Sequence, residues 1–192
     1  MPLSIHIIRV FLYCLLFVFS VILLALCATR LHYTTHLDPD DPLNYGVNFY
    51  DPIVAELTAT TVITLFWSTF IARTIYGRYE HRFLNTFMEE IIGLFILFLL
   101  WLVGAAIATA SRSPGVDPTK WGKLMWCQHY WACRILTTLL AFAWLGWLVV
   151  FALLVISCLF AFANRSWREP LHGRWDPRAT RYRDSQMRGV GV

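Results

Sequence analysis

Two ionisable side chains lie inside long apolar segments of this chain, where they could serve chemistry or pairing. Glu56 lies about one turn inside the apolar segment 52–76, and Arg134 lies at a similar depth in the apolar segment 131–162. A charged side chain within a membrane span is costly and marks either a functional site or a helix contact. We expect Glu56 and Arg134 to form an interhelical ion pair; the alternative is an ion or proton path through Glu56. The middles of the apolar segments hold no charged side chain, which favours the ion pair.

A second group of charges lies at the opposite ends of the apolar segments. Arg73 lies near the end of segment 52–76, and Glu89 and Glu90 precede the apolar segment 91–110. Carboxylates also suit the first turn of a helix, where the helix dipole is positive. The sequence therefore predicts an ion pair between Arg73 and one or both of these glutamates.

Histidine and cysteine offer no cofactor site. The six histidines fall at segment ends or in loops, so none could ligate haem from within facing helices. His32 and His36 have a metal-binding spacing, but no cysteine lies near them, and we expect no metal and no cofactor. Cys127 and Cys133 flank the start of the last apolar segment and are a candidate disulfide in an oxidising compartment. Whether they are bonded stays open, since an unbroken helix over both would hold their side chains apart.

Composition identifies the elements that must position these residues. Of the 192 residues, 58% are hydrophobic and 15% are charged, whereas a soluble domain has about 45–50% apolar and about 25% charged residues. Four segments (5–28, 52–76, 91–110 and 131–162) reach the roughly 20 apolar residues that a membrane helix needs. Continuous apolar runs exclude a β-barrel, whose strands alternate. We predict an all-α integral membrane four-helix bundle and no nucleic-acid binding.

Basic residues predict the orientation of the bundle. Of the 16 lysines and arginines, eleven lie on one side: Arg9, Arg73, Arg78, Arg82 and the seven arginines of the tail 163–192. The positive-inside rule therefore places both termini in the cytoplasm. The tail has no apolar period, and we expect it to be disordered.

The arginines of the tail are also candidates for contact with anionic lipid, because each basic residue near the inner leaflet adds about 1 kcal/mol of attraction. The alternative is that they only fix the orientation. The tail arginines that are candidates for this contact are Arg165, Arg168, Arg174, Arg178, Arg181 and Arg183.

A sterol-contact pattern, Arg9-x3-Tyr13-x-Leu15, lies near the other terminus.

Three segments carry a resemblance to a known family: 49–57 (FYDPIVAEL), 101–109 (WLVGAAIAT) and 127–147, which runs from Cys127 through Cys133 and Arg134 to Trp147. They resemble the MARVEL family, particularly its fungal members. The resemblance covers about residues 5–162. It implies four membrane helices, no catalytic residues, and work in membrane apposition, lateral organisation of sterol-rich membrane and vesicle traffic.

We therefore expect a four-span membrane domain over residues 1–162 and a cytoplasmic tail over residues 163–192. The expected function is non-enzymatic: organising membrane domains or vesicle traffic through lipid-selective packing. The alternative is a channel or transporter subunit that uses Glu56 and Arg134. Expected partners are membrane lipids, including sterol and anionic lipid, and further copies of this chain or other membrane proteins. The expected location is the plasma membrane or a membrane of the secretory pathway.

Overall fold

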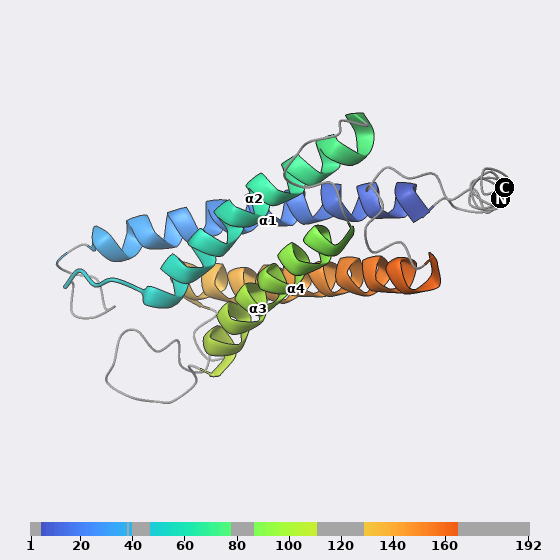
Figure 1. Ribbon diagram of the computed structural model, residues 1–192. Helices are drawn as coiled ribbons and strands as arrows, with labels where there is room; N and C mark the ends of the chain where they lie inside the picture. Colours follow the sequence, from blue (N-terminus) through green and yellow to red (C-terminus); the bar gives the residue numbers. More distant parts are fainter. Residues whose placement is uncertain (1–4, 38, 40–46, 78–86, 111–128, 165–192) are drawn as a thin grey trace, which may run out of the picture.

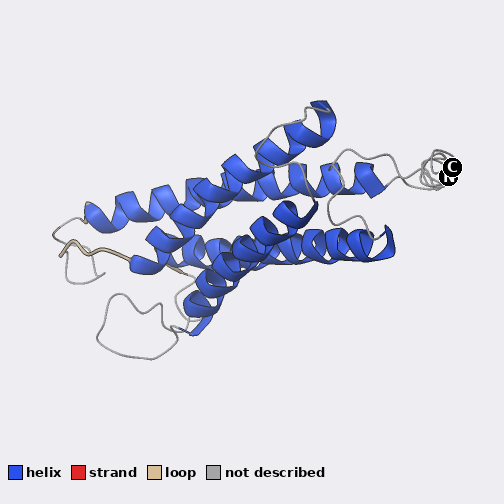
Figure 2. Ribbon diagram, viewed as in Figure 1, coloured by secondary structure: helices blue, strands red, loops and turns tan. Residues whose placement is uncertain are grey.

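The computed structural model describes residues 5–37, 39, 47–77, 87–110 and 129–164. Every regular element in these ranges is an α-helix (Figure 2). The helices are α1 (Ile5–Thr35), α2 (Pro52–Gly77), α3 (Phe87–Ala110) and α4 (Trp131–Asn164). Each contains a stretch long and apolar enough to cross a membrane. The prediction of an all-α, four-span membrane bundle is confirmed.

The four helices form an antiparallel bundle in which α2 and α3 are inclined to α1 and α4 (Figure 1). Helix α1 packs against α2 and α4, and α3 packs against the same two helices. Two pairs, α1 with α3 and α2 with α4, are therefore diagonal. We call the end where α1 begins and α4 ends the terminal end, and the opposite end the loop end. The distribution of arginine predicts that the terminal end faces the cytoplasm.

Two helices, α1 and α3, extend by a turn or more beyond the predicted apolar segments. Helix α1 continues past position 28 to Thr35, and α3 begins at Phe87 rather than near position 91. Hydropathy marks only the part of a helix that contacts hydrocarbon, whereas polar residues continue the same helix beyond it. Helix α4 has 34 residues, or about 51 Å at 1.5 Å per residue, against a hydrocarbon core of about 30 Å. It therefore tilts or projects from the membrane.

The start of α2 is determined by local sequence. The buried Asp51 side chain caps the helix, because its Oδ1 accepts a hydrogen bond from the backbone N of Ile53 at 3.2 Å. Pro52 follows as the first helical residue, where its missing N–H costs nothing. Just before the cap, the backbone N of Phe49 donates to the carbonyl of Thr34 at 3.0 Å. These bonds hold the entry of α2 against the end of α1.

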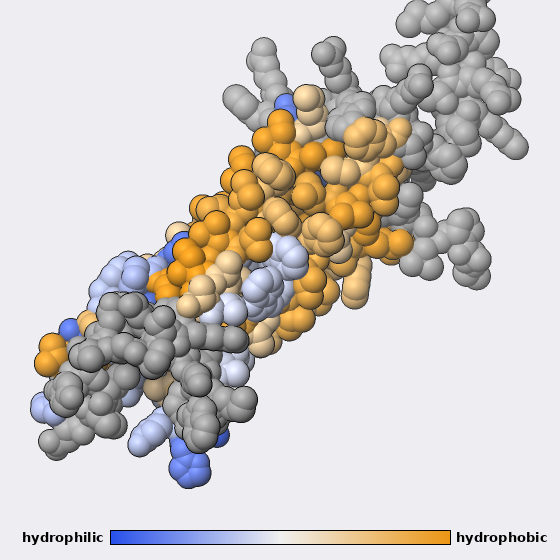
Figure 3. Space-filling view, turned by 90° about the horizontal axis from the view of Figure 1, so that it is seen from below, coloured by the Kyte–Doolittle hydropathy of each residue, from blue (hydrophilic) through white to orange (hydrophobic). Residues whose placement is uncertain are grey.

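Apolar side chains both fill the bundle and cover it. Fully buried residues come from all four helices, among them Leu16, Leu57, Trp101 and Leu139. Large apolar side chains also lie exposed around the outside, and one face of the central body is mostly hydrophobic (Figure 3). This is the surface that lipid tails cover in a membrane, where close packing between helices rather than exclusion of water holds the bundle together.

Candidate functional site

A buried ion pair lies near the terminal end of the bundle. Arg9 of α1 donates from Nη2 to Oε2 of Glu90, in the first turn of α3. The hydroxyl of Tyr13, one turn after Arg9, donates to the other carboxylate oxygen of Glu90 at 2.6 Å. All three side chains are fully buried. The side chains thus join two diagonal helices across the bundle, and Arg9 and Glu90 neutralise each other there.

This arrangement differs from the predicted pairing of Arg73 with Glu89 and Glu90. Glu90 points into the bundle and is paired with Arg9, whereas Arg73 is exposed on α2 and forms no ion pair within the described ranges. Glu89 is half-buried. The physical reason is that Arg73 turns toward the outside of α2, while Arg9 turns inward. The partner could have been sought from the sequence, because Arg9 lies near the same ends of the apolar segments as Glu90.

The structure does not bring Glu56 and Arg134 together. Oε1 of Glu56 accepts a hydrogen bond from the Thr60 hydroxyl at 2.9 Å. Its Oε2 is buried without a hydrogen-bond partner among the described residues and packs against the Cα of Gly104 on α3, where an added methyl group would collide with it. Arg134 is exposed on α4. Because Arg134 faces outward from α4 and the Glu56 carboxylate faces Gly104 of α3, the two side chains do not meet.

A row of polar side chains runs along α2 from Glu56. Thr60, Thr64 and Ser68 follow at intervals of four residues, and all three are buried. The indole Nε1 of Trp101 donates to the hydroxyl of Thr64 at 3.0 Å. Thr64 in turn donates to the backbone carbonyl of Thr60 at 2.7 Å. This row was not among the sequence predictions, although the signal was present, because residues four apart share one face of a helix.

Tryptophan rings pack against glycines at two levels of the bundle. The ring of Trp67 on α2 lies where a Cβ on Gly93 of α3 would be. The ring of Trp101 on α3 occupies the same place relative to Gly146 of α4. A glycine at each position is required because an added methyl group would overlap ring atoms rather than the flexible tip of a side chain. The central part of the described bundle is thus closed by large aromatic groups.

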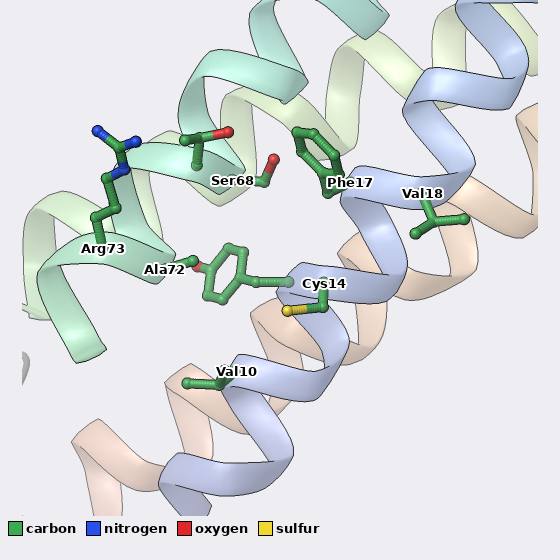
Figure 4. A pocket seen from close by; sticks show the side chains of 9 residues that line it. Val10, Cys14, Phe17, Val18, Ser68, Ala72 and Arg73 are labelled. Carbon is green, nitrogen blue, oxygen red and sulfur yellow. The ribbon is translucent and has the colours of Figure 1, made fainter. Parts of the chain in front are cut away.

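An apolar groove lies between α1 and α2 on the outside of the bundle, toward the terminal end (Figure 4). Its volume is about 490 Å³. We call it the α1–α2 groove. Its wall on α1 holds Val10, Tyr13, Cys14, Phe17 and Val18, and its wall on α2 holds Ser68, Thr69, Ala72 and Arg73.

The remaining predicted sites are only partly described. Cys133 is disulfide-bonded, and its predicted partner Cys127 lies outside the described residues. Cys14, Cys27 and Cys158 are free thiols. The six tail arginines proposed for lipid contact, Arg165, Arg168, Arg174, Arg178, Arg181 and Arg183, also lie outside the described residues.

The histidine pair shows no metal-binding cluster. The rings of His32 and His36 are stacked, with their centroids 4.7 Å apart, at the loop end of α1. Within residues 5–37, 39, 47–77, 87–110 and 129–164, no three side chains of histidine, cysteine, aspartate or glutamate gather to hold a metal ion. The expectation that the protein needs no metal stays a prediction.

Comparison with known proteins adds no identity. No protein-family model matches the chain, and neither a curated protein nor a solved structure is significantly similar to it. The protein is a four-span helical membrane protein, and its resemblance to the MARVEL family stays a prediction.

Proposed function

We propose that the protein is a non-enzymatic membrane organiser, which gathers selected lipids around a closely packed four-helix bundle. The observation that carries this proposal is the filled interior. Trp101 packs on Gly146 near the middle of α3 and α4, and Trp67 packs on Gly93 nearer the terminal end, so rings fill the interior where a conducting protein needs a polar path. The apolar side chains that face outward are then the surface that contacts and selects lipids.

The charged groups support the same function. Near the terminal end, Arg9 and Glu90 form an ion pair within the bundle, which is the usual way in which a membrane protein tolerates buried charge. Arg134, which a conducting pair would need, faces outward. This arrangement supports a structural role for the buried charges, which is to hold the helices together.

One observation favours the alternative function of a channel or transporter subunit. The row that begins at Glu56 and continues through Thr60 and Thr64 puts hydroxyl groups into the bundle at regular intervals. A proton path would need these hydroxyls to pass protons from one to the next. The hydroxyl of Thr64, however, donates to a backbone carbonyl of its own helix and accepts from Trp101. The row therefore fits a structural role better.

We extend this proposal to membrane apposition and vesicle traffic, which are the roles that the MARVEL resemblance implies. Exposed rings on different helices, such as Phe66 on α2 and Phe162 on α4, give the bundle a rough apolar surface. Such a surface packs differently against ordered and disordered lipid tails. Lateral sorting of lipids would follow from that difference.

Flux through reconstituted liposomes separates the two functions. The purified full chain and the variant Glu56→Gln are compared for proton and potassium flux, with protein-free liposomes as the baseline and an added ionophore as the positive control. We expect both proteins to leave the liposomes as tight as the baseline. Flux in the natural protein that Glu56→Gln abolishes would contradict the proposal and make Glu56 a conduction site.

A further inference from the structure

The α1–α2 groove has the dimensions and the lining of a hydrocarbon-binding site. Its volume of about 490 Å³ lies within the range of about 300–1,000 Å³ typical of small-molecule pockets. From Val10 to Val18 the groove follows α1 for about 12 Å at 1.5 Å per residue. This length lies in the half of the bundle nearer the terminal end, so a lipid of that leaflet can enter it from the side.

The hydroxyl groups in the groove wall are already engaged. The hydroxyls of Ser68 and Thr69 both donate to the backbone carbonyl of Leu65, at 3.2 and 2.8 Å. The hydroxyl of Tyr13 donates to Glu90 behind the groove, which leaves its ring in the wall. A polar ligand would therefore find few free donors deep in the groove, whereas a hydrocarbon chain needs none.

Arg73 gives the groove a charged end. It lies one turn before the end of α2, is exposed, and lines the same groove (Figure 4). An arginine side chain is long enough for its apolar stem to lie along the helix while its guanidinium reaches the headgroup level. A guanidinium binds phosphate through two parallel hydrogen bonds, which suits the headgroup of a phospholipid.

The sterol-contact pattern of α1 does not fit this site. The pattern requires Arg9 to face the ligand, but Arg9 is fully buried and bonded to Glu90. Of the remaining residues in the pattern, Tyr13 lines the groove, whereas Leu15 does not. The available cation is Arg73, and its chemistry favours a phosphate over a sterol hydroxyl.

We propose that the α1–α2 groove binds one acyl chain of an anionic phospholipid, whose headgroup is held by Arg73. The inference rests on the proposed function, because it names the lipid class and one place where the bundle selects it. It does not invoke the tail, since the described residues that line the groove belong to α1 or α2.

Photo-crosslinking of lipid to the full chain tests the site. The protein is reconstituted in phosphatidylcholine vesicles that contain a trace of lipid with a photoactivatable group on one acyl chain. The probe carries either a phosphatidylserine or a phosphatidylcholine headgroup, and the crosslinked peptides of α1 and α2 are quantified by mass spectrometry. We expect about fivefold more crosslinking by the serine lipid, the factor that corresponds to about 1 kcal/mol for one arginine near the membrane surface.

Three variants assign the selectivity to the groove. Arg73→Gln should reduce crosslinking by the serine lipid to the level of the choline lipid. Arg134→Gln, which removes an exposed arginine at the loop end, should leave the preference unchanged and is the matched control. Ala72→Phe should fill the groove and reduce crosslinking by both lipids there. The circular dichroism spectrum of each variant checks that the bundle is folded.

The outcomes distinguish this inference from the proposed function. Equal crosslinking by the two lipids in the natural protein, or a preference that survives Arg73→Gln in a folded protein, would overturn the groove as an anionic lipid site. Neither result would contradict the organising function, which depends on the absence of ion flux and on the selectivity of the whole lipid shell. Conversely, flux through Glu56 would refute the organiser even if the groove binds lipid.

Discussion

Replacing Arg9 alone should destabilise the bundle much more than replacing both members of its ion pair. Arg9 and Glu90 have no exposed surface, and each is the charged partner of the other. The variant Arg9→Met keeps an unbranched apolar side chain but leaves the Glu90 carboxylate buried with the Tyr13 hydroxyl as its hydrogen-bond donor. Breaking a buried pair in this way costs about 3–5 kcal/mol. We expect that loss in the free energy of unfolding.

Two further variants complete the measurement. In the double variant Arg9→Met/Glu90→Met both charges are gone, and its stability should return to within about 1–2 kcal/mol of the natural protein, because apolar replacement of a whole buried pair is often neutral. The variant Tyr13→Phe removes a hydrogen bond of 2.6 Å to a carboxylate, and hydrogen bonds to charged groups contribute about 1.5–3 kcal/mol. We therefore expect the largest loss for Arg9→Met, which leaves the Glu90 charge buried without its charged partner. The losses of Tyr13→Phe and of the double variant should be smaller.

Reversible unfolding in lipid bicelles measures these free energies. Arg73→Met is the matched control, because Arg73 is an exposed arginine near the same end of the bundle, and exposed substitutions usually change stability by less than about 0.5 kcal/mol. A loss below about 1 kcal/mol for Arg9→Met would refute the reasoning. So would a double variant whose loss equals the sum of the losses of Arg9→Met and Glu90→Met, each measured alone, because coupled residues must deviate from additivity.

Three other perturbations test the packing and the covalent structure. Gly146→Ala should cost about 1–3 kcal/mol of unfolding free energy, because the new methyl group meets the Trp101 ring; adding Trp101→Leu should recover part of the loss, and the absence of recovery would count against the contact. Thr64→Val should cost about 1 kcal/mol by removing the acceptor of the Trp101 indole, and equal thermal stability of the variant would argue that this bond adds nothing. Cys133 should resist alkylation in the denatured, unreduced protein and react after reduction; modification before reduction would disprove the disulfide.

The four helices could be predicted from sequence because each apolar run is longer than a soluble core requires. Local chemistry also predicted details such as the position of Pro52 in the first turn of α2. The predicted end of α1 and the predicted start of α3 lie inside the observed helices, since a helix that leaves the hydrocarbon keeps its hydrogen bonds after its hydropathy falls. These properties depend on residues that are close in sequence.

The contacts of the site could not be predicted in the same way. Arg9 and Glu90 are 81 positions apart, and their pairing depends on which helices are diagonal and on how each helix is rotated. Charge alone does not distinguish Arg73 from Arg9 as the partner of Glu90. Likewise, nothing in the sequence matches a particular tryptophan to a particular glycine, because the fit of Trp101 to Gly146 depends on the register between α3 and α4.

The selectivity of the lipid shell tests the central claim most directly. The full chain is reconstituted in phosphatidylcholine membranes with a spin-labelled lipid of either an anionic or a zwitterionic headgroup, and electron paramagnetic resonance gives the motionally restricted fraction of each. A protein that organises lipids should restrict the motion of the anionic lipid several times more strongly than that of the zwitterionic lipid. This difference should fall when Arg73 and the tail arginines are replaced by glutamine. Equal restriction of the two lipids by the natural protein would contradict the account.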